Sequence, residues 1–535
     1  MHLLRRSISS LILGQAKRGT YPYYDNHSLV LTGLVHSCAE ANDLTIAKAI
    51  CKSLRSGIGW NILARDFISV EINDVVAEKV LLELKEPTDA KRALSFFHWS
   101  AQMKKCTHQV QTYCLVIPIL VRAQLLIDAQ ALLESILNKS SDSCLRFAVV
   151  DSLISGYNAT FSSPLVFDLL VQAYAKLRKV ELGFVVCCYL EERGFSLSLV
   201  TMNRLIHVAQ KSDESALLWK IYEHLFERRI FPNEATIKAM MRDLCKEGKL
   251  RTSVDLLDKI HGRRCSASVI VNSHLILRIL DEGRIEVGLV LLKRMLRRNF
   301  IPDTVAYSYV IYAKAKLADF QSAFNVYEEM IKRGFEANSF VFTSLVGAYC
   351  ETGKVEEADQ LLQEMLLMGL KPYGDTFNFL VEGFAIAGEV GKSLNSCAKM
   401  MEDGLCPSLS SFNKMAGELR EIEDVKRANE LLTLALDRGF LPDERTYSHL
   451  IAGFGEKGYL QEALKLYYEM EHRSLCPELS AFSSLIKCMC RSGRLHEADK
   501  FFEIMKMCSI HPTEDLREAL INAHLKKGDK WLPEG

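Results

Sequence analysis

The stretch Ser339–Tyr373, SFVFTSLVGAYCETGKVEEADQLLQEMLLMGLKPY, decides the fold and is 35 residues long. Residues 340–351 carry apolar side chains at the spacing of one helical face. Gly353 follows in a turn, because glycine readily adopts the left-handed backbone that ends a helix. A second amphipathic helix is predicted over roughly 355–368. A hairpin this small cannot bury its own apolar faces, so the stretch predicts copies of itself on either side.

The sequence repeats this pattern with a period of 35 residues. Turn glycines recur at Gly248, Gly283, Gly353, Gly388, Gly458 and Gly493. Prolines near the end of the unit recur at Pro232, Pro302, Pro372, Pro407, Pro442, Pro477 and Pro512. A small residue at the expected helix crossing recurs at Ala323, Ala358, Ala428, Ala463 and Ala498. The predicted fold is therefore an all-α solenoid, with ten contiguous helix-turn-helix repeats over residues 164–513.

Composition is that of a folded chain without a strong charge preference. The 535 residues are 49% hydrophobic and 25% charged, and the formal net charge is zero, which argues against a uniformly basic surface. Sixteen cysteines occur without a C-x-x-C pair, so we expect reduced, structural cysteines and no metal site. No apolar run approaches the length needed to span a membrane.

The segments outside the array differ from it. Residues 1–26 contain four basic residues and no acid before Asp25, which is typical of a mitochondrial targeting presequence, with a chloroplast signal or a disordered basic tail as alternatives. Residues 27–109 are predicted to form a degenerate helical cap. Residues 110–163 are predicted to hold one atypical repeat, with Pro118 inside its first helix, followed by an insertion. Residues 514–535 are predicted to form a partial repeat that caps the C-terminal end.

Several repeat segments resemble the pentatricopeptide repeat family. They are Gly-Phe-x-Pro-Asp at 439–443, Met-x-x-x-Gly at 330–334 and 365–369, and Thr-Tyr-Ser-x-Leu-Ile at 446–451. The resemblance is to the repeat-only, plant-like organellar branch. It implies a right-handed superhelix that binds single-stranded RNA, with one base facing each repeat and recognised by two or three side chains.

In this family the fifth and the last residue of each unit recognise the base. The resemblance assigns that role to the pairs Asp168 with Ser198, Asn203 with Asn233, Lys238 with Ser268, Ser273 with Asp303, Ser308 with Asn338, Thr343 with Tyr373, Asn378 with Ser408, Asn413 with Asp443, Ser448 with Glu478, and Ser483 with Thr513.

Two physical arguments bear on these pairs. A polar residue at the end of a unit has an alternative role as the N-cap of the next helix. The fifth position is harder to explain structurally, because small polar residues are poor choices inside a helix. Eight of the ten units nevertheless carry Asn, Ser or Thr there. A row of hydrogen-bonding side chains along one face suits the edges of unstacked bases.

The family's pairing tendencies imply bases for five units. Ser273 with Asp303 implies guanine, and Ser308 with Asn338 implies adenine. Asn203 with Asn233 and Asn378 with Ser408 imply pyrimidines, and Asn413 with Asp443 implies uracil. The predicted target, from 5′ to 3′, is N-Y-N-G-A-N-Y-U-N-N. The unit 339–373 is assigned no base and is expected to serve as scaffold.

Two further positions of the unit separate the halves of the array. The second residue, which in this family wedges between bases, is aliphatic at Leu165, Val200, Ile270 and Val305. The thirteenth, which in this family lies near phosphate, is basic at Lys176, Lys211, Lys246 and Lys316 and acidic at Asp281, Glu351, Glu421 and Glu456. A solvated charged face is the alternative. We predict that the N-terminal half supplies most of the attraction to phosphate.

No catalytic motif is found in the sequence. The H-x-E and P-C-x-x-C signatures of zinc deaminases, phosphate-binding glycine loops and zincin motifs are all missing. We therefore expect a monomeric, non-enzymatic protein without a cofactor or metal, which binds single-stranded organellar RNA and cooperates with other RNA-processing factors. The competing hypothesis is a helical scaffold that binds a protein partner.

Overall fold

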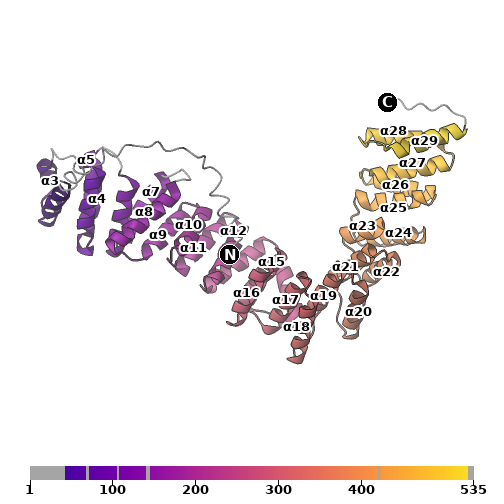
Figure 1. Ribbon diagram of the computed structural model, residues 1–535, viewed down its shortest axis with the longest axis horizontal. Coiled ribbons are helices and arrows are strands. Elements are labelled where there is room, and N and C mark those ends of the chain that lie inside the picture. The colour runs from indigo at the N-terminus through magenta and orange to yellow at the C-terminus, as the bar shows by residue number, and fades with distance from the viewer. Residues whose placement is uncertain (1–42, 68–71, 105–107, 140–144, 420–421, 528–535) are drawn as a thin grey trace, which may run out of the picture. The chain divides into compact units, whose positions relative to one another are not determined.

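A computed structural model describes residues 43–67, 72–104, 108–139, 145–419 and 422–527 (Figure 1). The predicted presequence lies outside these residues. The described residues form helices and no strand, and they divide at Pro232 into two compact units. No helix in the described ranges has the length and apolar character that a membrane crossing requires.

The first unit is a succession of helices. A helix at 43–55 precedes the named elements. These are α3 (Trp60–Asp66), α4 (Asp74–Glu83), the 3₁₀ turn η1 (Pro87–Asp89), α5 (Ala90–Lys104), α6 (Val110–Arg122), α7 (Leu126–Lys139), α8 (Leu145–Thr160), α9 (Leu165–Lys176), α10 (Val180–Glu192), α11 (Leu199–Lys211) and α12 (Ser215–Glu227).

The second unit continues the alternation of helices of similar length. They are α13 (Glu234–Lys246), α14 (Leu250–His261), α15 (Ala267–Asp281), α16 (Ile285–Leu296), α17 (Asp303–Lys316), α18 (Phe320–Lys332), α19 (Ser339–Glu351), α20 (Val355–Leu367), α21 (Gly374–Ile386), α22 (Val390–Glu402), α23 (Leu409–Gly417), α24 (Ile422–Leu436), α25 (Glu444–Glu456), α26 (Leu460–His472), α27 (Leu479–Arg491), α28 (Leu495–Met507) and α29 (Glu514–Lys527).

Each 35-residue repeat supplies two consecutive helices, and the first helix of one repeat packs on the first helix of the next. This holds for α9 on α11, and for α17, α19, α21, α23, α25, α27 and α29 in series. The small residue at the helix crossing is fully buried at Ala323, Ala358, Ala428, Ala463 and Ala498. The α-solenoid predicted from the repeat is confirmed within each unit.

The turn between the two helices of a repeat adopts left-handed backbone, as the glycines predict. All six turn glycines have positive φ, for example +75° at Gly353. The same register position is left-handed at Arg178, Asp213 and Ala318, with φ of +57°, +54° and +56°. The hairpin therefore imposes this conformation even where the side chain disfavours it.

Helix α8 occupies the predicted insertion and packs on α6. Pro118 lies inside α6, which continues through it from Val110 to Arg122. Proline has no N–H to donate to the carbonyl of Cys114, four residues earlier. Gly156 of α8 comes so close to that carbonyl that a Cβ at Gly156 would lie 1.9 Å from the Cys114 oxygen. The contact between α6 and α8 thus depends on both the proline and the glycine.

The repeat register is shifted at α14. A residue with left-handed backbone ends the second helix of each repeat, and Arg229 and Asn299 in the adjacent repeats place it at position 264. In this repeat the left-handed residue is instead Gly262, with φ of +73°. Helix α15 is capped by Ser266 instead of the predicted Ser268, which lies inside the helix. Helix α14 also contacts α17 and α19, beyond its own neighbours.

The approach of α8 to α6 gives a prediction for two matched glycines inside helices. Gly156→Ala should lower the free energy of unfolding by about 1–3 kcal/mol or more, because the new Cβ overlaps a backbone oxygen. Gly391→Ala in α22 should instead raise it by about 0.5–1 kcal/mol, because a Cβ there meets no atom within 4 Å. Urea denaturation measures both variants. Equal effects would contradict this account of the packing.

Candidate nucleic-acid interface

The first helices bring several of the predicted pairs into direct contact. Ser308 Oγ accepts a hydrogen bond from the Asn338 side chain at 2.9 Å. Asp168 accepts from the backbone N–H and the hydroxyl of Ser198 at 2.9 and 2.7 Å. The side-chain oxygen of Asn378 accepts from the backbone N–H of Ser408 at 2.9 Å. Residues 30 apart in sequence therefore meet at the junction between consecutive repeats.

The pair Asn413 and Asp443 is the most extensively hydrogen bonded. The Asn413 amide donates to both Asp443 oxygens, at 3.0 and 3.2 Å. The Thr446 hydroxyl donates to the Asn413 oxygen at 2.7 Å. Burial acts to raise the pKa of the Asp443 carboxyl, but hydrogen bonds from the Thr446 backbone and from Asn413 outweigh it. The pKa of this carboxyl is therefore held below its ordinary value.

The last residue of a repeat also caps the next helix, as the alternative interpretation held. A side-chain oxygen accepts from the backbone N–H three residues later at Ser198, Asn233, Asn338, Ser408 and Asp443. The helix end and the predicted recognition pair thus use the same side chain. Capping fixes the last residue, and the fifth residue of the same repeat then contacts it.

The remaining predicted pairs are placed differently from these. Ser273 is buried, whereas Asp303 is exposed as the first residue of α17. Thr343 bonds to Thr376 instead of Tyr373, with 2.6 Å between their hydroxyl oxygens. Ser448 Oγ accepts a hydrogen bond from the backbone N–H of Glu478 at 3.0 Å, which is the same type of contact that joins Asn378 and Ser408. Asn203 lies on α11 of the first unit and Asn233 caps α13 of the second. Ser483 lies on α27, half-buried.

Three cavities in the second unit open between first helices, and each is lined by a fifth residue. A cavity of about 720 Å³ is lined by Asn413 and Asp443. A cavity of about 290 Å³ is lined by Thr343 and Tyr373. A cavity of about 970 Å³ is lined by Ser483. The fifth position therefore borders space that a ligand of the size of a nucleotide can enter.

The aliphatic second residues are placed unequally. Val200 is 72% exposed, whereas Ile270 is 7% exposed and Val305 is fully buried. Both enclosed residues lie on helices next to the register shift at α14. Their predicted contact with bases stays a prediction, and it requires that these side chains become uncovered.

The predicted phosphate-binding lysines are exposed but differ in their partners. Lys176 forms an ion pair with Glu134 at 2.7 Å. The Lys316 ammonium lies 5.7 Å from the centre of the Tyr312 ring. Lys211 and Lys246 are exposed at the ends of α11 and α13. The acidic Glu421 lies outside the described residues.

A basic cavity at the C-terminal end was missed at the sequence level. Lys487, Arg491, Lys526 and Lys527 line the cavity of about 970 Å³, with Glu456 as its single acidic residue. Arg491 and Lys526 occupy the thirteenth position of their repeats. Extending the register to the last helices would therefore have identified two of these four residues.

Protein-family models match parts of the sequence that forms these helices. The model described as "PPR repeat family" matches residues 302–350, 337–386 and 442–490, and the model described as "PPR repeat" matches residues 480–510. The chain contains pentatricopeptide repeats. The matched segments correspond to helices α17–α21 and α25–α28, which keep the regular register.

Relatives and solved structures with pentatricopeptide repeats cover parts of the chain. A mitochondrial pentatricopeptide repeat-containing protein of Arabidopsis thaliana is 51% identical over 215 residues, which are 40% of this chain and 39% of the relative. A second mitochondrial one from the same plant is 26% identical over 205 residues, 38% of this chain and 30% of the relative. The aligned regions thus span well under half of these relatives.

Among solved structures, the pentatricopeptide repeat protein PPR10 from maize is 16% identical, and the match covers 90% of this chain and 76% of that one with a TM-score of 0.37. A variant of PPR10 in complex with an 18-nucleotide psaJ RNA element is also 16% identical, with coverage of 91% and 76% and a TM-score of 0.40.

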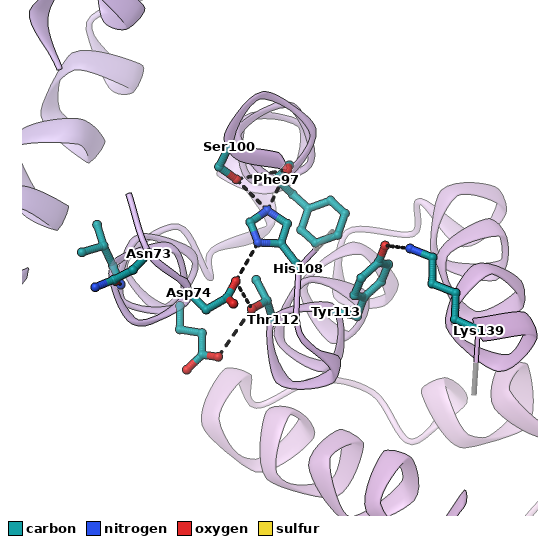
Figure 2. Close-up of polar contacts among 10 residues, drawn as sticks. Asn73, Asp74, Phe97, Ser100, His108, Thr112, Tyr113 and Lys139 are labelled. Carbon is teal, nitrogen blue, oxygen red and sulfur yellow. Dashed lines mark hydrogen bonds and ion pairs between the residues drawn. The ribbon is translucent and has the colours of Figure 1, made fainter. Parts of the chain in front are cut away.

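A Ser–His–Asp chain in the first unit does not form an open catalytic site. His108 Nε2 lies 2.8 Å from Ser100 Oγ, and Nδ1 lies 2.9 Å from Asp74 (Figure 2). Ser100 is fully buried and donates its hydroxyl to the carbonyl of Phe97 at 3.1 Å, so its oxygen is closed to a substrate. The network instead ties α4, α5 and the start of α6 together.

A buried cluster of Cys187, Glu191 and His224 has the donor types of a metal site, with its ligand atoms within 4.8 Å of one another. The Glu191 carboxylate, however, is bound by His224 at 2.7 Å and by the Arg228 guanidinium at 2.8 Å. A cation would have to displace a guanidinium that already balances this charge. The cluster is accounted for as a buried ion-pair network between α10 and α12.

The lowered pKa of Asp443 predicts acid-sensitive stability at this junction. A carboxyl whose pKa is lower in the folded chain than its unfolded value of about 3.9 stabilises the fold above that pH, and this contribution is lost as pH falls through the folded pKa. Asp443→Asn should have a lower free energy of unfolding than the wild type at neutral pH, because it keeps the helix cap but loses the carboxylate oxygen that accepts a second contact from Asn413. It should lose less free energy of unfolding on acidification below about pH 4. Urea titrations at neutral and acidic pH measure this, and equal losses would show that Asp443 is not the sensitive group.

Proposed function

We propose that this protein binds single-stranded RNA in a sequence-specific manner, with one base facing each repeat, and that it acts by binding and not by catalysis. The observation that carries the proposal is the direct bonding of fifth and last residues beside open cavities, best developed at Asn413 and Asp443. The two side chains are held by each other and by a helix cap, so they are preorganised before a ligand arrives.

The chemistry of a held pair suits recognition of a base edge. In the Asn413–Asp443 pair, the amide keeps a second N–H, and the carboxylate keeps unused lone pairs. A base that enters the adjoining cavity meets both a donor and an acceptor at fixed positions. A base with the wrong order of donors and acceptors would leave buried polar groups unpaired, which is the costly outcome that produces specificity.

The first test is a base-substitution series. A labelled ten-nucleotide RNA of the form N-Y-N-G-A-N-Y-U-N-N should bind more tightly than the matching DNA or duplex in fluorescence anisotropy at physiological salt. Replacing the uracil opposite Asn413 and Asp443, or the guanine and adenine at the fourth and fifth positions, should weaken binding by roughly 5- to 100-fold each. Unchanged affinity after substitution at all three positions would contradict the proposal of one base per repeat. Failure to retain RNA at all would favour the protein-binding scaffold.

The second test concerns the phosphate contacts. Changing Lys176, Lys211, Lys246 and Lys316 together to Ala should reduce the dependence of log K on log salt, by about 0.7 for each lost phosphate contact. Changing Lys487, Lys526 and Lys527 to Ala should reduce it as well, through the basic cavity. The matched control is Lys465→Ala with Lys500→Ala on the second helices α26 and α28. An unaltered slope in the first variant would contradict the N-terminal assignment.

We further propose a mitochondrial location. The basic, acid-poor residues 1–26 support it, and two relatives are named as mitochondrial proteins. Crosslinking of the full-length protein in plant cells should then recover mitochondrial transcripts. Recovery of plastid transcripts instead would redirect the proposal to the chloroplast.

A further inference from the structure

The repeat at 339–373 carries no recognisable pair, yet its cavity is unlike the others. Four aromatic rings line the cavity of about 290 Å³: Tyr312 on α17, Phe340 on α19, Tyr373 at the N-cap of α21, and Phe379 on α21. We call this space the aromatic cavity. Small-molecule sites span roughly 300–1,000 Å³. Its volume is therefore at the lower end, which suits a single planar base.

The rings are fixed before any ligand binds. The Tyr312 hydroxyl donates to Asp281, and the Tyr312 and Phe340 ring centres are 5.5 Å apart. Phe379 lies against Gly347, where a Cβ would be 2.8 Å from the ring. Gly347 is therefore required for Phe379 to lie so close to α19. The four rings are each half-buried, so part of each ring remains open to the cavity.

Carboxylates at the edge of the aromatic cavity provide negative charge and hydrogen-bond acceptors. Asp375 and Glu351 both line it and are exposed. Asp375 precedes Phe379 by four residues on α21, which places the two on one helical face. Ionised carboxylates only accept hydrogen bonds. The Lys316 ammonium lines the same cavity and is available to a phosphate.

We infer that the aromatic cavity binds a guanine base, flipped out of a single strand and stacked on the rings. The inference rests on the proposed RNA-binding function. Guanine presents two adjacent donors, N1–H and the N2 amino group, which one carboxylate accepts together. In adenine and cytosine, a ring nitrogen that accepts hydrogen bonds lies beside the single amino group. In uracil, two carbonyl oxygens flank the single N–H. In each of these bases an acceptor would therefore face an oxygen of the carboxylate and repel it. Stacking supplies affinity, and Asp375 supplies the selection.

This inference changes the predicted target at one position. The sixth nucleotide, opposite 339–373, becomes guanine, although neither Thr343 nor Tyr373 follows the usual pairing. Recognition there would depend on the aromatic rings, which include that of the last residue Tyr373, and on Asp375 at the second position of the next repeat, in place of a polar pair.

The test compares the four bases at the sixth position of the ten-nucleotide RNA by anisotropy with the full-length protein. Guanine should bind about tenfold more tightly than the others. Asp375→Asn should abolish this preference, whereas Phe379→Leu should weaken all four bases. The matched controls are Asp403→Asn at the C-cap of α22 and Tyr468→Leu on α26, both exposed, and they should change neither result. Circular dichroism tests whether each variant is folded. Glu351→Gln should keep the preference for guanine, because the selection is assigned to Asp375.

Guanosine 5′-monophosphate provides an independent probe. Calorimetry should detect its binding in preference to the adenosine, cytidine and uridine monophosphates, with loss in Asp375→Asn. Equal RNA affinity for all four sixth bases would overturn the guanine inference while leaving RNA binding intact. If no RNA binds but the guanosine nucleotide still binds through Asp375, the proposed function fails and the cavity assignment stands.

Discussion

The burial of each hairpin against its neighbours is the constraint on which the rest of the structure depends. Two helices of about thirteen residues have too little surface between them to form a core, so stability comes from stacking. The fully buried alanines at the helix crossings allow the two helices of a repeat to approach closely. The left-handed turn then returns the chain in a fixed direction. As a result, the same positions of each first helix recur from repeat to repeat on one face, where they are available to contact a ligand.

One junction between repeats meets both a structural and a functional need. Asp443 caps α25 and holds Asn413, and Ser198 similarly caps α11 while bonding Asp168. Helix capping and ligand recognition both use the same residue types, Asp, Asn and Ser. The two interpretations are therefore compatible, because a capped side chain is also an immobilised one. Recognition gains from this rigidity, since less conformational entropy is lost on binding.

The sequence predicted the repeat, its turns and its buried alanines, because these follow from local chemistry at a constant spacing. Gly353 and its equivalents adopt the left-handed backbone that their type suggests, but Arg178, Asp213 and Ala318 do so only because the hairpin requires it. The two-residue shift at Gly262 could not be seen in a pattern that is otherwise free of insertions. The pairing of Asn413 with Asp443 was expected from resemblance, whereas the aromatic cavity depends on residues from three helices brought together by packing.

The contact of α14 with α17 and α19 affects how this part of the chain folds. In a regular solenoid each repeat interacts only with its neighbours, so stability is nearly a sum of local terms and one end can fray alone. Here His261 lies 2.7 Å from Thr304, and the Lys259 ammonium lies 5.0 Å from the Tyr373 ring. These contacts join residues more than one repeat apart and raise the local contact order, which slows folding. We therefore expect the segment from α14 to α21 to fold and unfold as one cooperative unit within the array.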